Sequence, residues 1–292
     1  MDPGAALEHV LARALDGPPL RDDARIALHF HPDTDLRGEP TLERILRDGS
    51  YLSQFVTGTS NGGLTAEGRG DRWRWEQRMF GGAYDDAPAG SRPVYGALAV
   101  DRDPYGPSPR FGSAWFRLRR ATVDRATFAF PDSAQGPEAF GVARRMGLVE
   151  LLRASAPSDP LDRYVESHVH GGVAVPGDVE ALVLDPSHRD VLGGVLHGVD
   201  LAVEWHPGYV VDVGTIARHA DYRGSDVVGL AARVAEDGVI TPAVLGRWRG
   251  RPDVDPQILK QVWHSVARFG RTAPDGDGGA SGAAATDTPG PR

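Results

Sequence analysis

The chain has 292 residues, of which 40% are hydrophobic and 25% charged, so it is long enough to bury a large core. Its formal net charge of -8 argues against a general nucleic-acid binder, and the absence of cysteine excludes disulfides, thiol nucleophiles and finger-type zinc sites. No apolar run approaches the length of a membrane span, and the first residues lack the pattern of a secretory signal. The sequence therefore predicts a cytoplasmic protein with no membrane partner.

The first fifty residues predict a helix, a strand and a second helix. Helical periodicity covers residues 8–15, and the alternating segment R-I-A-L-H-F-H at residues 25–31 is rich in strand formers. The second helix is expected over residues 41–48, with Thr41 as its candidate N-cap and Gly49 as its C-terminal stop. These elements lead into the most unusual part of the chain.

The stretch from residue 51 to residue 98 combines glycines with many polar and aromatic side chains. Gly58, Gly62 and Gly63 allow positive φ angles and a close approach of the backbone to a ligand. Hydroxyl and amide groups beside these glycines suit hydrogen bonding to phosphate, ribose or carboxamide, and they belong to Thr57, Thr59, Ser60 and Asn61. Trp73, Trp75, Phe80 and Tyr84 follow at roughly helical spacing, which predicts a helix that the segment F-G-G-A-Y then breaks.

The remainder of the chain predicts mostly strands and then mostly helices. Strands are expected over 94–100, 111–119, 125–130, 164–169 and 179–184, with one helix over 139–155. Helices are expected over 189–199, 225–236, 241–248 and 256–269, with a short strand at 203–206. This order predicts an α+β fold with a mixed, largely antiparallel sheet. The expected parts are an N-terminal helix and linker (1–24), an α+β core (25–187), a helical extension packed on it (188–270) and a disordered tail (271–292).

Two predicted strands carry polar side chains on a single face, where a core would be apolar. His29 and His31 are two residues apart and therefore point the same way, and the same holds for Glu166, His168 and His170. Either strand could instead be an edge strand with these side chains in solvent or bonded to backbone carbonyls. The glycine-rich stretch contains neither the phosphate-loop motif G-x-x-x-x-G-K-[ST] nor G-x-G-x-x-G nor the hydrolase motif G-x-S-x-G.

Several blocks of the sequence resemble a bacterial protein family of unknown function. They run from about residue 25 to residue 270 and include S-Q-F-V-T-G-T-S-N-G-G-L-T, F-G-G-A-Y, R-P-V-Y-G-A-L, P-R-F-G-S and Y-V-E-S-H-V-H-G-G. The order of elements also resembles the core of ADP-ribosyltransferases: a first strand with His31, then S-x-F-x-T-G-x-S, an aromatic helix, and a late strand with Glu166.

The second resemblance implies a sheet core of ADP-ribosyltransferase type and an enzyme that uses NAD as a substrate, with no metal required. Glu166 would be the catalytic carboxylate that stabilises the positive charge developing on the ribose. The residues that the resemblance assigns to NAD binding are His31, Ser53, Thr59, Ser60, Asn61, Gly62 and Tyr84. The implied partners are a small-molecule nucleotide and an acceptor that the sequence does not identify.

Two other functions fit the same residues. A metal-dependent hydrolase would use His29, His31, His168 and His170 as ligands, with Asp33 or Glu166 as the carboxylate. The barrel architecture common to such enzymes would require strands and helices to alternate throughout, and this chain does not show that pattern. The protein could also be a non-catalytic interaction domain, with the aromatic stretch 73–84 as its partner surface.

Overall fold

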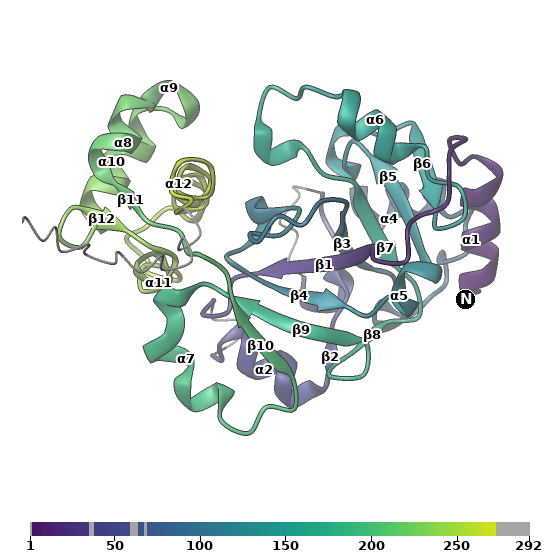
Figure 1. Cartoon of the computed structure of the whole chain (residues 1–292), viewed down its shortest axis with the longest axis horizontal. Coiled ribbons are helices and arrows are strands. Elements are labelled where there is room, and N and C mark those ends of the chain that lie inside the picture. Colours follow the sequence, from purple (N-terminus) through teal and green to yellow (C-terminus); the bar gives the residue numbers. More distant parts are fainter. Residues whose placement is uncertain (1, 35–37, 59–63, 67–68, 273–292) are drawn as a thin grey trace, which may run out of the picture.

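The computed structural model describes residues 2–34, 38–58, 64–66 and 69–272. Its centre is an eight-stranded sheet of order β10-β9-β4-β1-β3-β7-β5-β6, in which only the β9–β10 pair is parallel (Figure 1). The expected α+β fold with a mixed, largely antiparallel sheet is confirmed. The strands of this sheet are β1 (Arg25–Phe30), β3 (Val94–Ala99), β4 (Ala114–Leu118), β5 (Ala126–Phe130), β6 (Ala139–Val142), β7 (Glu166–Val169), β9 (Val179–Leu184) and β10 (Ala202–Trp205).

Two short ladders and a set of helices complete the architecture. The ladders pair β2 (Ser50–Tyr51) with β8 (Val173–Ala174) and β11 (Val211–Asp212) with β12 (Val239–Ile240). The helices are α1 (Pro3–Ala12), α2 (Thr41–Asp48), α3 (Gln54–Thr57), α4 (Asp71–Met79), α5 (Ala121–Asp124), α6 (Leu148–Ala154), α7 (Arg189–Leu196), α8 (Val213–Arg218), α9 (Ala220–Arg223), α10 (Ser225–Val234), α11 (Pro242–Gly246) and α12 (Pro256–Phe269). Within the described ranges, no helix has the length and apolar character needed to cross a membrane.

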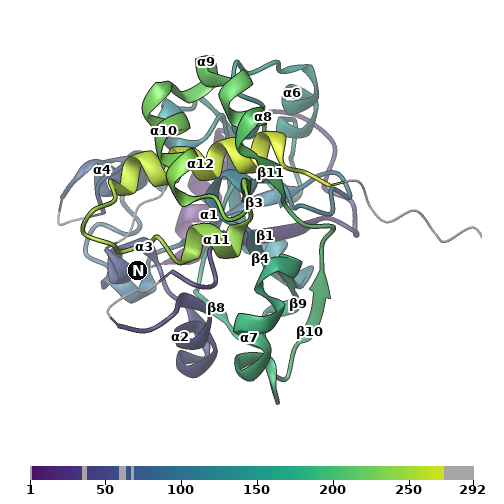
Figure 2. The same cartoon turned by 90° about the vertical axis from the view of Figure 1, so that its left-hand side faces the viewer.

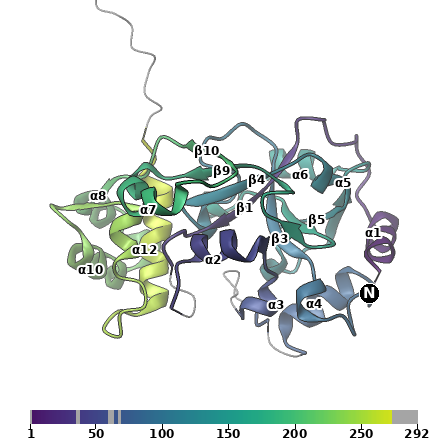
Figure 3. The ribbon, with the colours of Figure 1, turned by 90° about the horizontal axis from the view of Figure 1, so that it is seen from below.

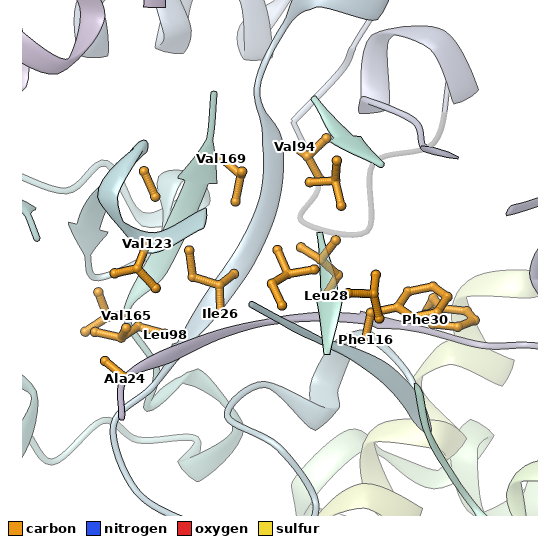
Figure 4. Close-up of a cluster of buried hydrophobic side chains, with 14 of the residues drawn as sticks. Ala24, Ile26, Leu28, Phe30, Val94, Leu98, Phe116, Val123, Val165 and Val169 are labelled. Atoms are coloured by element: carbon orange, nitrogen blue, oxygen red, sulfur yellow. The ribbon is translucent and has the colours of Figure 1, made fainter. Parts of the chain in front are cut away.

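The main core lies against one face of the sheet. Ile26, Leu28 and Phe30 alternate along β1 and point into this core, because successive side chains of a strand face opposite ways (Figure 4). Helix α2 covers part of this face with Leu42 and Ile45, and seen from below it lies in front of the sheet (Figure 3). The other face carries polar side chains on β1, β5 and β7. There α1 and α4 pack against the β5–β6 end, and α4 also contacts Tyr95 of β3 and His168 of β7.

The C-terminal helices form a second core beside the end of the sheet. Helix α12 crosses this group, with α8, α9 and α10 on one side and α11 on the other (Figure 2). Trp263 of α12 is fully buried against Tyr209 there, and its indole N–H donates to the carbonyl of Pro109 at 3.0 Å. The sheet itself continues past residue 187, because β10 pairs with β9. The helical group therefore begins after β10, and the bond from Trp263 to Pro109 is one of the contacts that join it to the sheet.

Four local expectations differ from the structure. The segment 139–155 is not one helix: Phe140 and Val142 belong to strand β6, where they pair with β5 and pack against α1 and α4, and a helix begins only at Leu148. Thr41 is not the N-cap of α2, because Pro40 holds that position and the Thr41 hydroxyl donates to the carbonyl of Thr34. The first helix begins five residues earlier than expected, since Asp2 caps it through the amide of Gly4. The disordered tail is expected from residue 271, but Arg271 pairs with Asp103 and the Thr272 carbonyl accepts from the Tyr105 hydroxyl, so these two residues belong to the ordered body. Residues 273–292 of the expected tail lie outside the described residues.

The sheet divides between β1 and β3, and this fork positions the candidate site. The two strands pair only from Arg25–Ala99 to Ala27–Ala97, whereas β1 continues to pair with β4 as far as Phe30. On the other side of the fork β3 continues to pair with β7 as far as Val94. Gly96 stands at the point of separation, where an added Cβ would lie 2.6 Å from the carbonyl oxygen of Ala27. Because Gly96 has no side chain, β1 and β3 can approach each other closely at this point before they separate.

We predict that Gly96→Ala destabilises the protein by about 1–3 kcal/mol, because the new methyl group would push β1 away from β3. Gly229→Ala is the matched control: Gly229 is exposed within α10 with open space around it, and the change should stabilise the helix by about 0.5–1 kcal/mol. Urea unfolding of both variants measures the difference. A Gly96→Ala variant as stable as the unmodified chain would contradict the described fork.

Candidate functional site

A cavity of about 200 Å³ opens in the fork between β1 and β3. It is lined from one side by His29, Phe30 and His31 of the β1 end, and from the other by Tyr95, Gly96 and Glu166 of β3 and β7. Further walls come from α2, β2, α3, α4 and the 108–111 connection. The residues there include Arg44, Tyr51, Gln54, Thr57, Arg72, Ser108, Phe111 and Tyr164.

Glu166 is the acidic group that β7 presents to this cavity. The register places Ala97 and Ala129 directly beside it on the neighbouring strands, so its own face of the sheet leaves room for a ligand. The carboxylate is nonetheless only 7% exposed and is held by three protein donors. The Ser133 hydroxyl donates to Oε2 at 2.9 Å, the Ser133 amide to Oε1 at 3.3 Å, and His168 Nε2 lies 2.9 Å from Oε1.

The surroundings of Glu166 keep it ionised. Burial alone raises its pKa, but the hydrogen bond with His168, the charge of that ring when it is protonated, the positive charge of Arg72 and the bond from Ser133 outweigh that effect, so that the pKa lies below its usual value. Arg72 is itself buried: its Nη1 donates to Ser133 Oγ at 2.6 Å and its guanidinium lies 4.4 Å from the centre of the Tyr95 ring. The site therefore presents a fixed negative charge beside a buried positive one.

The two histidines at the end of β1, His29 and His31, differ in how many of their ring nitrogens are hydrogen-bonded to the protein. His29 Nδ1 lies 3.1 Å from the carbonyl oxygen of Gly112 and its Nε2 faces the amide of Ser108 at 3.4 Å, so both nitrogens face backbone groups. His31 is partly exposed to the cavity and packs edge-on against Trp263 at 4.9 Å. Among the described residues the buried Nδ1 of His31 has no hydrogen-bond partner, so His31, which directly follows β1, has bonding capacity that the protein does not use.

The other predicted ligand-binding residues are spread over different surroundings. Ser53 is buried and its hydroxyl donates to the carbonyl of Ala89 at 2.6 Å, and Tyr84 is buried with its hydroxyl 2.7 Å from His170 Nδ1. Neither residue lines the cavity. Thr59, Ser60, Asn61 and Gly62 lie outside the described residues.

Sequence reasoning missed the aromatic and cationic part of the cavity. Tyr51 of β2, Tyr95 of β3 and Tyr164, which precedes β7, line it, and Arg72 enters from α4. Arg72 belongs to the helix expected after the glycines, but nothing in the local pattern indicates that it would be buried beside a carboxylate 94 residues later. Such a pairing depends on the strand order of the sheet, which no local pattern contains.

His168 and His170 are enclosed by protein groups. Both are at most 1% exposed, and Thr127 Oγ lies 3.1 Å from His168 Nδ1 and 3.1 Å from His170 Nε2. Together with the contacts to Glu166 and Tyr84, these bonds occupy all four ring nitrogens. In the part of the chain that the structure describes, no three His, Asp or Glu side chains are grouped as metal ligands.

A second polar cluster joins the sheet to the C-terminal helices. Ser113 Oγ lies 3.4 Å from His188 Nε2, and His188 Nδ1 lies 3.8 Å from a carboxylate oxygen of Asp33, in the order of a serine-hydrolase triad. Ser113 and His188 are buried, at 2% and 0% exposure, and neither lines the cavity in the fork. Arg249 also pairs with Asp33 at 2.5 Å. We interpret this cluster as a structural connection rather than a catalytic group.

A larger cavity of about 790 Å³ lies over β4, β9 and β10, with Trp115 and Trp205 in its walls. Its central charges neutralise one another, since Arg117 pairs with Glu180 at 2.9 Å and also with Glu204. None of the residues predicted to bind NAD or to catalyse lines this cavity. The smaller cavity in the fork is therefore the better candidate for a functional site.

Comparison with known proteins gives a family but no activity. Residues 25–153 and 147–269 match the model of a family described as a protein of unknown function (DUF3626). The chain belongs to this family. No curated protein matches it. Membership of DUF3626 confirms the resemblance to a family of unknown function. Every described residue in the walls of the fork cavity lies within the matched ranges.

Buried neutral histidines predict a loss of stability in mild acid. Burial lowers the pKa values of His29, His170 and His264 to about 3, well below the value of roughly 6.5 in an unfolded chain. Their contribution is fully present above pH 6.5 and is lost as the pH falls toward 3, because the unfolded chain binds protons that the folded chain does not. Each of these histidines should lower the free energy of unfolding by about 1.4 kcal/mol per pH unit below 6.5.

Urea unfolding between pH 7.5 and 5 measures this slope. His264→Leu should make it shallower, since both ring nitrogens of His264 are buried without a partner among the described residues. Replacement of the exposed His197 by Gln is the control and should leave the slope unchanged. Stability that stays constant down to pH 5 would refute the described burial of these side chains.

Proposed function

We propose that this protein is an enzyme of ADP-ribosyltransferase type that cleaves the nicotinamide–ribose bond of NAD, with Glu166 as its key carboxylate. The proposal rests on one observation above all. His31 at the end of the first sheet strand and Glu166 on a late strand, 135 residues apart in the sequence, line the same cavity. The resemblance of the sequence to ADP-ribosyltransferases assigns the NAD contact and the catalytic carboxylate to these two residues.

Cleavage of the nicotinamide–ribose bond requires a fixed negative charge beside the ribose, and the Glu166 carboxylate offers one. As the bond between C1′ of the ribose and N1 of nicotinamide breaks, its electron pair passes to the ring nitrogen and nicotinamide leaves as a neutral molecule. Positive charge develops on the ribose, and a fixed carboxylate in a partly dry cavity stabilises it. The acceptor then forms a bond to C1′ and releases its proton. The acceptor is water or a group on another molecule, and the cavity does not specify which.

The aromatic walls support the same substrate. The nicotinamide ring of NAD carries a positive charge, and the electron-rich rings of Tyr51, Tyr95 and Tyr164, which line the cavity, favour such a cation. A cavity of about 200 Å³ is smaller than those that enclose whole drug-sized ligands, so it would hold the nicotinamide-ribose end of NAD while the adenylate end extends outside.

We predict that Glu166→Gln lowers the rate of NAD cleavage by on the order of 10²-fold or more, because glutamine keeps the shape of the side chain but removes its charge. NAD should still bind. The free energy of unfolding should fall by about 1–3 kcal/mol, since buried Arg72 loses part of its counter-charge. The measurement is nicotinamide release from NAD in cell lysate, which supplies acceptors. Glu150→Gln, on the exposed side of α6, is the matched control and should behave as the unmodified chain does.

The same variants separate the alternative functions. A metal-dependent hydrolase would bind zinc or manganese stoichiometrically, and Glu166→Gln would weaken metal retention while His31→Ala abolished it. An interaction domain would show neither effect. Indistinguishable NAD consumption by the unmodified chain and a well-folded Glu166→Gln variant would end the transferase proposal.

A further inference from the structure

Behind Glu166 a line of buried side chains connects β7 to β5 and to the loop after α4. From the cavity inward the contacts are Glu166 Oε1 to His168 Nε2 at 2.9 Å, His168 Nδ1 to Thr127 Oγ at 3.1 Å, Thr127 Oγ to His170 Nε2 at 3.1 Å, and His170 Nδ1 to the Tyr84 hydroxyl at 2.7 Å. Glu166 is the one member that lines the cavity.

The carboxylate at one end fixes the direction of every bond in this line. An ionised Glu166 only accepts hydrogen bonds, so His168 carries a proton on Nε2. If His168 is neutral, its Nδ1 accepts from the Thr127 hydroxyl, whose oxygen then accepts from His170 Nε2–H. His170 Nδ1 is left to accept from the hydroxyl of Tyr84. All four donors thus point toward Glu166.

The opposite direction leaves a buried donor without a partner. A doubly protonated His168 would donate to Thr127, Thr127 to His170, and His170 to the oxygen of Tyr84. The Tyr84 hydroxyl hydrogen would then need another acceptor, and the described residues offer it none. Burying an unsatisfied hydroxyl donor is costly, so the direction toward Glu166 is favoured. The pKa of His170, which burial lowers to about 3, agrees with a neutral ring.

Aromatic rings seal this line from water. Phe80 packs edge-on against both imidazoles, at 5.5 Å from His168 and 5.1 Å from His170, and Tyr95 packs edge-on against His168 at 4.9 Å. Hydrogen bonds in a dry environment polarise one another and have no competing solvent. Structural stability alone does not require four polar side chains behind Glu166, because β5, β7 and the loop after α4 could meet through apolar groups.

We propose that His168 is the positioning residue of Glu166, and that Thr127, His170 and Tyr84 hold His168 in the Nε2–H tautomer so that it always donates to the carboxylate. The role in catalysis rests on the proposed cleavage of NAD, whereas the tautomers are a property of the unliganded chain. The remaining charged or titratable groups that face Glu166 are Arg72 of α4, Tyr95 of β3 and Tyr164, which precedes β7. None of these three belongs to the line.

The test compares Thr127→Val, which removes the hydroxyl at nearly constant volume, with Thr127→Ser, which keeps it. In the full chain with ¹⁵N-labelled histidine at pH 8, NMR should show both His168 and His170 as neutral Nε2–H tautomers. Thr127→Val should change the tautomer population of His168 and raise the pKa of the Glu166 carboxyl, and Thr127→Ser should restore both. The rate constant kcat for NAD cleavage should fall about tenfold in Thr127→Val with KM nearly unchanged.

The two proposals fail in different ways. A proton on Nδ1 of His168 in the unmodified chain, or a Thr127→Val variant with the tautomer and the Glu166 titration unchanged, would overturn the positioning role whatever the enzymatic result. If the chain shows the expected tautomers but does not consume NAD, the hydrogen-bond line is supported and the transferase proposal is refuted. The tautomers are measured in the unmodified chain, so the positioning role of His168 can be tested even if Thr127→Val folds poorly.

Discussion

The separation of β1 from β3 is the constraint on which the site depends. Two strands that pair for three residues and then part leave a gap in an otherwise continuous sheet, and each keeps its hydrogen bonds by pairing with its other neighbour. The gap admits a ligand to the polar face of the sheet, where Glu166 stands between two alanines. An unbroken ladder in this position would have closed the cavity.

A buried carboxylate is costly, and the structure offsets that cost with specific neighbours. Ser133 and His168 supply hydrogen bonds, and Arg72 supplies a positive charge that is itself held against Tyr95. The charge of Glu166 is thus fixed before any substrate arrives, which is the arrangement that stabilises a developing cation most effectively. The proposed enzymatic role and the unusual polarity of this sheet face have one physical basis.

The sequence predicted the parts of this account that follow from local patterns. Alternation located β1, strand-forming residues located β7, and the spacing showed that His29, His31, Glu166 and His168 occupy single faces. Helical periodicity located α12, and Gly49 marked the end of α2. The sequence predicts a helix over Phe140 and Val142, because a short apolar run fits the helical and the strand period equally well. The structure shows a strand there, since this segment pairs with β5. Arg72 and Tyr95 reach Glu166 through tertiary contacts, so no spacing along the chain could have revealed them. Tyr164 is only two residues from Glu166, but that spacing does not show that its ring lines a cavity.

The central claim is that NAD binds in the fork with its reacting bond beside residue 166. A crystal structure of the Glu166→Gln variant with NAD tests it most directly, because slow turnover would preserve the substrate. The account predicts the nicotinamide ring among Tyr51, Tyr95 and Tyr164, with C1′ of its ribose about 3–4 Å from the side chain of residue 166. NAD bound elsewhere, for example in the larger cavity beside Trp115 and Trp205, or no bound NAD at saturating concentration, would contradict it.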